Sequence, residues 1–274
     1  MQDRHAAGER MMSQVRSADG TAIGYERSGS GPALILVDGA LCSRAFGPTP
    51  KLAPMLASHF TVYAYDRRGR GQSGDTQPYA RQREVEDLAA LIEAAGGSAS
   101  LLGLSSGGAL ALEAAASGLR VDKVIAYEPP YVHDDTQGGG ADHDAQLKRL
   151  LAEGKRGGAV KYFLKDMVGA PAAMVVVMRL IPWIWRKLEA VAHTLPYDVA
   201  VMTAFTIPRA RFGSIAVPTL TMNGTRSDPK LKRAARAVAD AIPGGQYRTL
   251  EGQTHNVKPG VLAPAVLEFL ASAS

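Results

Sequence analysis

The sequence predicts an α/β protein in which helices cover a mostly parallel, doubly wound sheet. Continuous apolar runs, which are typical of strands buried on both faces, recur along the chain. Helical stretches separate these runs, and this alternation favours a parallel sheet. Of the 274 residues, 46% are hydrophobic and 21% are charged. This composition predicts a large buried core and excludes a disordered or fibrous chain.

The amino-terminal half of the chain supplies most of the predicted strands. Residues 13–17 and 21–27 are predicted to form a β-hairpin around the turn Ala18-Asp19-Gly20. Further on, apolar residues recur at helical spacing between positions 85 and 92, and Gly96-Gly97 ends this predicted helix. The continuous apolar runs predict strands at residues 33–37, 61–65, 100–104 and 124–127.

The alternation of strands and helices lapses between residues 133 and 212. This segment opens with a polar loop and continues with helical stretches rich in Met, Trp and Val. We expect it to be a helical cap insertion over the carboxyl ends of the strands, where ligands bind in such sheets. Residues 13–132 and 213–274 would then form the core, and residues 1–12 a disordered extension. In the second part of the core, strands are predicted at 217–222 and 247–250 and helices at 229–241 and 261–270.

Charge and hydropathy limit the kinds of molecule that the protein is expected to bind. The chain has 31 basic and 26 acidic residues, a net charge of +5, which requires no polyanionic partner. The basic helix predicted at 229–241 has no aromatic residues between its charges, so no nucleic-acid binding is expected. The most apolar window, 172–185, is too short to cross a membrane. The expected partner is a small-molecule substrate, and the sequence leaves a homodimer open.

Cysteine and histidine usage predicts a cytoplasmic protein without a metal or other cofactor. The single cysteine, Cys42, cannot form an internal disulfide, so folding needs no oxidising compartment. Residues 1–10 carry several charged side chains and no apolar run, unlike a secretory signal peptide. Acidic and histidine residues flank the three glycines at 138–140, but their spacing matches no fixed set of metal ligands.

The strongest chemical signal is the sequence Gly103-Leu104-Ser105-Ser106-Gly107. It follows an apolar strand and precedes an alanine-rich helix, which is the context in which G-x-S-x-G presents a nucleophilic serine. The flanking residues must be small because the serine sits on a strained turn. A helix start also directs amide N–H groups and the positive end of the helix dipole towards developing negative charge.

Together with two further motifs, this turn resembles the α/β-hydrolase family, and the resemblance extends from residue 13 to residue 270. Residues 65–73, Tyr-Asp-Arg-Arg-Gly-Arg-Gly-Gln-Ser, look like the family's D-x-R-G-x-G-x-S loop. Residues 251–255, Glu-Gly-Gln-Thr-His, look like its late histidine loop. The resemblance implies an α/β-hydrolase fold in which Ser105 is the nucleophile and His255 is the base that takes its proton.

The carboxylate that would orient His255 has two candidates. The family most often places an Asp three residues beyond a glycine after the late strand, but that position is Ser227 here, and Asp228 comes one residue later. The second location used in the family is the end of the strand after the nucleophile helix, where this chain has Glu128. Zearalenone-lactonase-like hydrolases use a glutamate there and carry Asp-Gly where this chain has Asp38-Gly39. We favour Glu128 and keep Asp228 as the alternative.

The resemblance also implies an oxyanion hole and suggests substrate contacts. Its backbone donors would be the amide of Ser106 and that of Gly39 or Ala40. Asp38 is either a substrate or oxyanion-loop contact or a simple turn residue. Substrate contacts are also suggested for four residues of the insertion, which could equally pack the cap: Met178, Trp183, His193 and Tyr197.

These residues predict a serine hydrolase that cleaves a carboxylic ester or lactone of a mostly apolar small molecule. Ser105 would attack the carbonyl, and water would hydrolyse the acyl-enzyme. Two alternatives stay open. The same triad could serve C–C bond hydrolysis or perhydrolysis, or the chain could be a receptor-like, ligand-binding member with little turnover.

Overall fold

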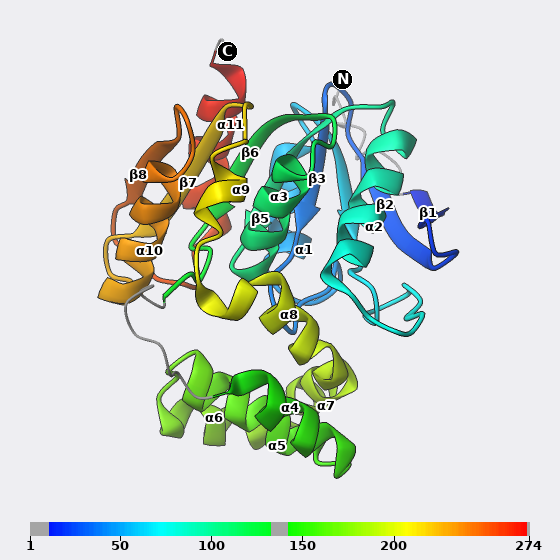
Figure 1. Cartoon of the computed structure of the whole chain (residues 1–274), viewed down its shortest axis with the longest axis vertical. Helices are drawn as coiled ribbons and strands as arrows, with labels where there is room; N and C mark the ends of the chain where they lie inside the picture. Colours follow the sequence, from blue (N-terminus) through cyan, green and yellow to red (C-terminus); the bar gives the residue numbers. More distant parts are fainter. Residues whose placement is uncertain (1–10, 133–141, 273–274) are drawn as a thin grey trace, which may run out of the picture.

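A computed structural model describes residues 11–132 and 142–272, and it contains a single mixed sheet in this part of the chain (Figure 1). The strands are β1 (Met11–Arg16), β2 (Ala22–Ser28), β3 (Ala33–Val37), β4 (Thr61–Tyr65), β5 (Ala99–Leu104), β6 (Val121–Tyr127), β7 (Thr219–Gly224) and β8 (Gln246–Leu250). They lie in the order β1-β2-β4-β3-β5-β6-β7-β8. β2 is antiparallel to both β1 and β4, and all other neighbours are parallel. The predicted mostly parallel α/β fold is therefore confirmed.

Helices cover both faces of this sheet. The helices of the core are α1 (Thr49–Leu56), α2 (Arg81–Ala94), α3 (Ser106–Ala116), α10 (Pro229–Asp240) and α11 (Pro259–Ala271). Side chains of α1 and α11 share one buried cluster, and those of α2, α3 and α10 share the other. The central strands are buried on both faces because each cluster takes alternate residues of a strand.

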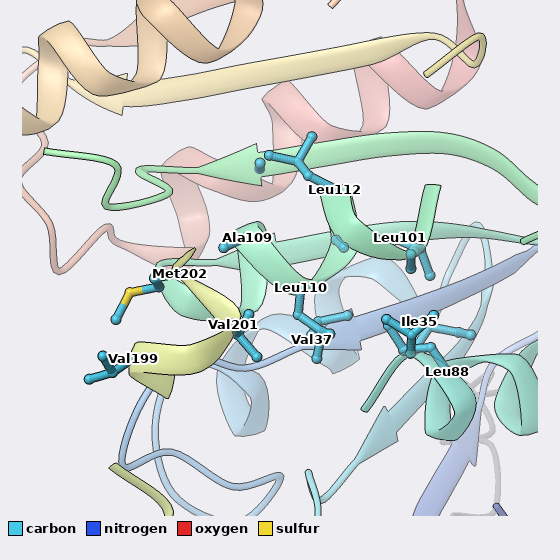
Figure 2. Packing of buried hydrophobic residues seen from close by; sticks show 14 of the residues in the cluster. Ile35, Val37, Leu88, Leu101, Ala109, Leu110, Leu112, Val199, Val201 and Met202 are labelled. Atoms are coloured by element: carbon cyan, nitrogen blue, oxygen red, sulfur yellow. The ribbon is translucent and has the colours of Figure 1, made fainter. Parts of the chain in front are cut away.

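Strand β3 shows this alternation directly. Leu34 and Leu36 point into the cluster under α1 and α11, whereas Ile35 and Val37 point into the cluster under α3. Figure 2 shows Val37 beside Leu110 of α3 and Ile35 beside Leu88 of α2. This double burial explains why the strand is a continuous apolar run in the sequence. It also fixes the position of the residue after Val37, which opens the loop towards the candidate site.

The described residues between β6 and β7 are helical or in loops. The α-helices are α4 (His143–Ala152), α5 (Arg156–Tyr162), α6 (Ala172–Arg179), α7 (Pro182–Ala190), α8 (Leu195–Val201) and α9 (Arg209–Phe212). Helices α4 to α7 form a separate layer, and α8 lies between this layer and the core (Figure 1). Because β6 leads directly into this segment, the layer faces the carboxyl ends of the parallel strands. No helix in the described ranges is long and apolar enough to span a membrane.

One sequence-based boundary is wrong. We expected residues 1–12 to be a disordered extension, but β1 begins at Met11 and pairs Met11 with Arg27 and Met12 with Glu26. Both residues belong to the sheet because their backbone pairs with β2, and this pairing does not depend on how polar the preceding segment is. Residues 1–10 lie outside the described part of the chain, as do residues 133–141 with the three glycines and the acidic and histidine residues before them.

Candidate active site

Ser105 lies on a strained turn between β5 and α3. Its backbone dihedrals are φ 55° and ψ −125°, a region that residues with a side chain rarely adopt. The amide of Ser105 donates to the carbonyl of Tyr127, 2.8 Å away, which ties the turn to β6. Strain persists only where the surroundings enforce it, so the fold itself presents this serine.

The glycines of the motif are required by packing around this turn. A Cβ on Gly103 would overlap the carbonyl oxygen of Gly107, and a Cβ on Gly107 would overlap the carbonyl oxygen of Val37. Helix α3 therefore starts in direct contact with the backbone of β3. This contact is the physical reason for the small residues in G-x-S-x-G here.

His255 and Glu128 meet at the carboxyl end of the sheet. His255 lies on the loop after β8, and Glu128 directly follows β6 with a left-handed φ of 47°. The imidazole Nδ1 of His255 is 2.7 Å from Oε2 of Glu128. A carboxylate at this distance selects the tautomer in which Nδ1 carries the proton, which leaves Nε2 as the proton acceptor.

The carboxylate of Glu128 is fully buried, and both of its oxygens are hydrogen-bonded. Its Oε1 accepts from the amide of Gly224, 2.8 Å away, and from the hydroxyl of Ser227. Burial alone would raise the pKa of Glu128, but the hydrogen bonds from His255, Ser227 and Gly224 outweigh burial and hold the pKa below its usual value. The site therefore keeps a carboxylate anion beside the imidazole.

Asp228 lies elsewhere, although the sequence made it the alternative acid. It is exposed and caps α10, where its carboxylate accepts from the amide of Lys230 at 2.7 Å. Ser227, which occupies the position where the family pattern expects an acid, instead donates to Glu128. The structure thus brings Glu128, and not Asp228, to His255.

The candidate oxyanion loop touches the serine turn. A Cβ on Gly39 would lie 3.1 Å from Cβ of Ser105, so only a glycine lets the two backbones approach this closely. Ser106 is the first residue of α3, and amides in the first turn of a helix have no acceptor within that helix. Gly39, Ala40 and Ser106 therefore bring backbone N–H groups to the surroundings of Ser105.

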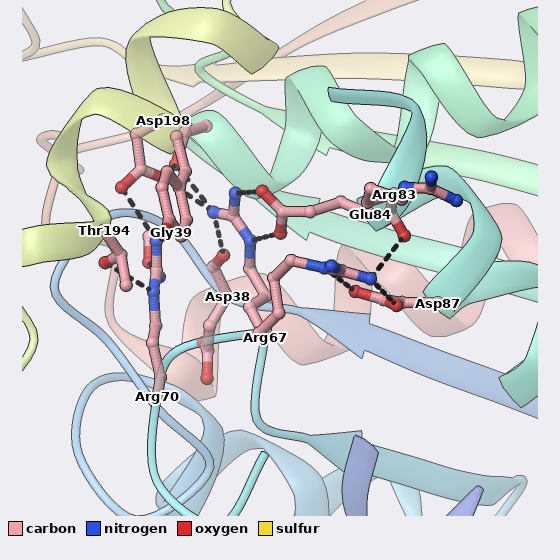
Figure 3. Close-up of polar contacts among 12 residues, drawn as sticks. Asp38, Gly39, Arg67, Arg70, Arg83, Glu84, Asp87, Thr194 and Asp198 are labelled. Atoms are coloured by element: carbon pink, nitrogen blue, oxygen red, sulfur yellow. Dashed lines mark hydrogen bonds and ion pairs between the residues drawn. The ribbon is translucent and has the colours of Figure 1, made fainter. Parts of the chain in front are cut away.

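A buried ionic cluster, which the sequence analysis did not identify, lies beside these backbones (Figure 3). Arg67 and Arg70 of the loop after β4 both pair with Asp198 of α8, with Nη–Oδ distances of 2.7 Å. Arg67 also pairs with Glu84 of α2 at 2.7 Å, and Asp198 accepts from the hydroxyl of Ser106 at 2.7 Å. Three arginines within residues 67–70 were the available signal, but nothing in the sequence identified Asp198 as their partner.

Comparison with known proteins decides the family. The sequence model that describes the alpha/beta hydrolase family matches residues 29–267, which is most of the chain. The chain belongs to the alpha/beta hydrolase family. The predicted α/β-hydrolase fold is thereby confirmed as well.

Relatives within this family extend over most of the chain. The chain is 29% identical over 233 residues to a pimeloyl-[acyl-carrier protein] methyl ester esterase from Xanthomonas campestris, which covers 83% of this chain and 89% of that protein. A crystal structure of an alpha/beta hydrolase from Sphaerobacter thermophilus is 53% identical, with a TM-score of 0.88 over 94% of this chain and 100% of that one. The esterase RhEst1 from Rhodococcus, 21% identical, shares the fold, with a TM-score of 0.66 over 96% of this chain and 99% of its own.

Within this hydrolase, the substrate contacts suggested by the sequence fall into two groups. Tyr197 stacks on Tyr79 of the core with ring centroids 3.8 Å apart, and its hydroxyl accepts from Nε2 of Gln77 at 2.6 Å. His193 lies 3.5 Å from the carboxylate of Asp75. Both residues thus contact side chains of the core where residues 192–201 meet it, and the substrate contacts suggested for them stay predictions.

The other two candidates lie on the helical layer. Trp183 is 59% exposed on α7, and Nζ of Lys187 lies 5.7 Å from the centre of its ring. The same Lys187 lies 5.4 Å from the ring centre of Phe46 in the loop after Gly39. Trp183 therefore lies on the side of α7 that faces Phe46 of the core, whereas Met178 is half-buried against the core cluster.

Asp38 is buried with no hydrogen-bond partner for either carboxylate oxygen. Burial raises the pKa of Asp38 to about 7.

Burial likewise raises the pKa of the Cys42 thiol to about 12, so this nearby cysteine is not a thiolate nucleophile at neutral pH. Across the described ranges, no three His, Cys, Asp or Glu side chains are grouped so that they could hold a metal ion.

Proposed function

We propose that this protein is a carboxylic ester hydrolase that acts through an acyl-enzyme on Ser105. The observation that carries the proposal is the buried Glu128 carboxylate bonded to Nδ1 of His255, in a chain that also holds Ser105 on a strained turn. The esterase names of the Xanthomonas relative and of RhEst1 support the same class of reaction.

In the proposed mechanism, His255 Nε2 takes the proton of Ser105 as Oγ attacks the ester carbonyl. The carbonyl oxygen becomes an oxyanion held by the amides of Ser106 and of Gly39 or Ala40. Collapse expels the alcohol, which takes the proton from His255 and leaves an acyl group on Ser105. Water then attacks the acyl group with His255 again as base, and the acid is released. Throughout, Glu128 stabilises the imidazolium.

The proposed substrate is a small, mostly apolar carboxylic ester or lactone. The exposed Trp183, which shares Lys187 with Phe46 of the loop after Gly39, supports an apolar substrate. The methyl ester in the name of the Xanthomonas relative supports an ester of a short alcohol. A panel of p-nitrophenyl esters, methyl esters and lactones of increasing acyl length tests both features.

The decisive experiment is intact-mass analysis after incubation with a fluorophosphonate, for the wild type and Ser105→Ala in parallel. An activated serine displaces fluoride from phosphorus, so we expect one adduct on the wild type and none on the variant. If neither the fluorophosphonate nor a smaller sulfonyl fluoride labels the wild type, the proposal is wrong. If the wild type is labelled but cleaves only a C–C bond of a diketone substrate, the triad assignment survives and the ester assignment does not.

A further inference from the structure

We propose that Arg67, Arg70 and Asp198 are positioning residues for the oxyanion hole and make it depend on the placement of α8. This proposal rests on the proposed ester hydrolysis. These three residues, called here the oxyanion cluster, contact both backbone segments that would supply the hole, the loop at residues 38–40 and the start of α3. None of them is expected to touch the reacting atoms, since each is buried behind those segments.

The first step concerns the loop at residues 38–40. Nη1 of Arg67 donates to the carbonyl of Asp38 at 3.3 Å, and Nη1 of Arg70 donates to the carbonyl of Gly39 at 2.7 Å. In a planar trans peptide, the C=O and the following N–H point in opposite directions within one plane. Anchoring these two carbonyls therefore fixes the directions of the Gly39 and Ala40 amides, the two candidate donors of this loop.

The second step concerns the other arm of the hole, at the start of α3. The hydroxyl of Ser106 donates to Oδ1 of Asp198 at 2.7 Å and accepts from Nη1 of Arg67 at 3.2 Å. Ser106 is thereby held through its side chain while its amide is left for the substrate. One guanidinium, that of Arg67, thus contacts both arms, and it sets their relative position.

The third step concerns the rigidity of the oxyanion cluster. Asp198 is fully buried, and each of its carboxylate oxygens pairs with one arginine at 2.7 Å. Burial would raise the pKa of Asp198, but Arg70 and Arg67 outweigh it and hold the pKa low. Glu84 balances the second positive charge through two bonds to Arg67, at 2.7 and 2.8 Å. Two cations and two anions in a dry environment strongly resist displacement.

The final step concerns the origin of Asp198. It is the only member of the oxyanion cluster that comes from the segment between β6 and β7. It also lies within α8, which Tyr197 fastens to the core by stacking on Tyr79. A displacement of α8 would therefore withdraw the shared anion from Arg67, Arg70 and Ser106 at once. The ability of the hole to bind an oxyanion therefore depends on the position of the helical layer.

The same loop offers a matched control. Arg68 is as deeply buried as Arg67, and its ionic partners are Asp87 at 2.7 Å and Asp19 at 2.9 Å. Asp87 lies on the side of Arg67 away from Asp198 (Figure 3). Asp87→Asn therefore removes a buried charge paired with an arginine, as Asp198→Asn does, but remote from the hole.

The experiment compares wild type, Asp198→Asn and Asp87→Asn in three measurements. These are kcat and KM for a p-nitrophenyl ester, the inhibition constant of a trifluoromethyl ketone, and the melting temperature. Ser105 adds to the ketone carbon to give a tetrahedral oxyanion, so this inhibitor reports on the hole. Active sites are counted with the fluorophosphonate, so that a smaller active fraction is not mistaken for slower chemistry.

For Asp198→Asn, we expect kcat to fall about 10- to 100-fold, with the ketone weakened in parallel and KM within about threefold of wild type. For Asp87→Asn, we expect a comparable loss of thermal stability, with kcat and ketone affinity within about twofold of wild type. Equal kinetics in both variants would overturn the proposal and leave the cluster a structural ion network.

A second variant keeps the proposal testable if Asp198→Asn fails to fold. Ser106→Ala keeps the backbone amide and all charges but cuts the side-chain link to Asp198 and Arg67. We expect kcat and ketone affinity to fall together by about 3- to 10-fold. Unchanged values would overturn the proposal. A wild type with neither labelling nor turnover would instead refute the proposed function, so the two failures are distinguishable.

Discussion

Glu128 illustrates how much a single residue depends on its surroundings. Its side chain is buried and its backbone has a left-handed φ. Three donors bond its carboxylate, one each from the end of β7, the loop after β7 and the loop after β8. Asp228 is exposed just before α10, and its carboxylate caps that helix. A carboxylate thus contacts the imidazole of His255 in one place and caps a helix in the other.

At this scale, we predict that Glu128→Gln lowers kcat by about 10²- to 10⁴-fold, because the amide no longer stabilises the imidazolium or selects its tautomer. KM should change little. Steady-state kinetics on a p-nitrophenyl ester measure both. The matched control is Asp228→Asn, which keeps a good cap and should retain wild-type kinetics. Full activity of Glu128→Gln beside an inactive Asp228→Asn would reverse the assignment.

At the scale of elements, the site is built where β3, β5 and β6 end side by side. Parallel strands bring their carboxyl ends to one edge, so Asp38, Ser105 and Glu128 follow three neighbouring strands. The close approach of α3 to β3 then holds the serine turn. This approach leaves no space for a side chain at Gly107, and the equally close approach of α3 to β5 leaves none at Gly103.

We predict that Gly107→Ala destabilises the fold by several kcal/mol, because its Cβ would overlap the carbonyl of Val37 and force α3 away from β3. Activity should be lost together with stability. The control is Gly118→Ala, where φ is 77° but nothing lies within 4 Å of the added carbon. It should cost only about 1–2 kcal/mol from backbone strain. Urea denaturation of both variants checks this, and equal losses would contradict it.

At the scale of the whole molecule, the buried ionisable groups lie in two kinds of environment. Arg67, Arg70 and Glu84 have charged partners, whereas the Asp38 carboxyl has no hydrogen-bond partner. An acid whose pKa is raised on folding binds protons more tightly in the folded state than in the unfolded state. Stability therefore decreases as pH rises from its ordinary pKa of 3.8 towards its folded pKa of about 7.

We predict that Asp38→Asn removes this decline. The variant should gain stability relative to wild type as pH rises from about 4 to 7, by about 1.4 kcal/mol per pH unit at most. Below about pH 4, both folded forms are neutral at this position and the difference should level off. Urea denaturation of both proteins across this range measures the difference. A difference that does not vary with pH would contradict the prediction.

The sequence by itself determined most strands and helices of the core and the order of the motifs. The strand at residues 61–65 was predicted with its observed bounds, and the predicted strands at 100–104 and 247–250 differ from β5 and β8 by one residue each. Such strands are predictable because burial on both faces leaves a local apolar run. Helix α1 was missed because Pro50 and Pro54 obscure its periodicity, although both are accommodated there.

Only the tertiary structure shows that Glu128, and not Asp228, contacts His255 and that Asp198 is the partner of Arg67 and Arg70. His255 and Glu128 are 127 positions apart in the sequence. Asp198 is 131 positions from Arg67 and 128 from Arg70. Local patterns record which residues are buried and in which element. They do not record which charges face each other after the chain folds, because that depends on how separate elements pack.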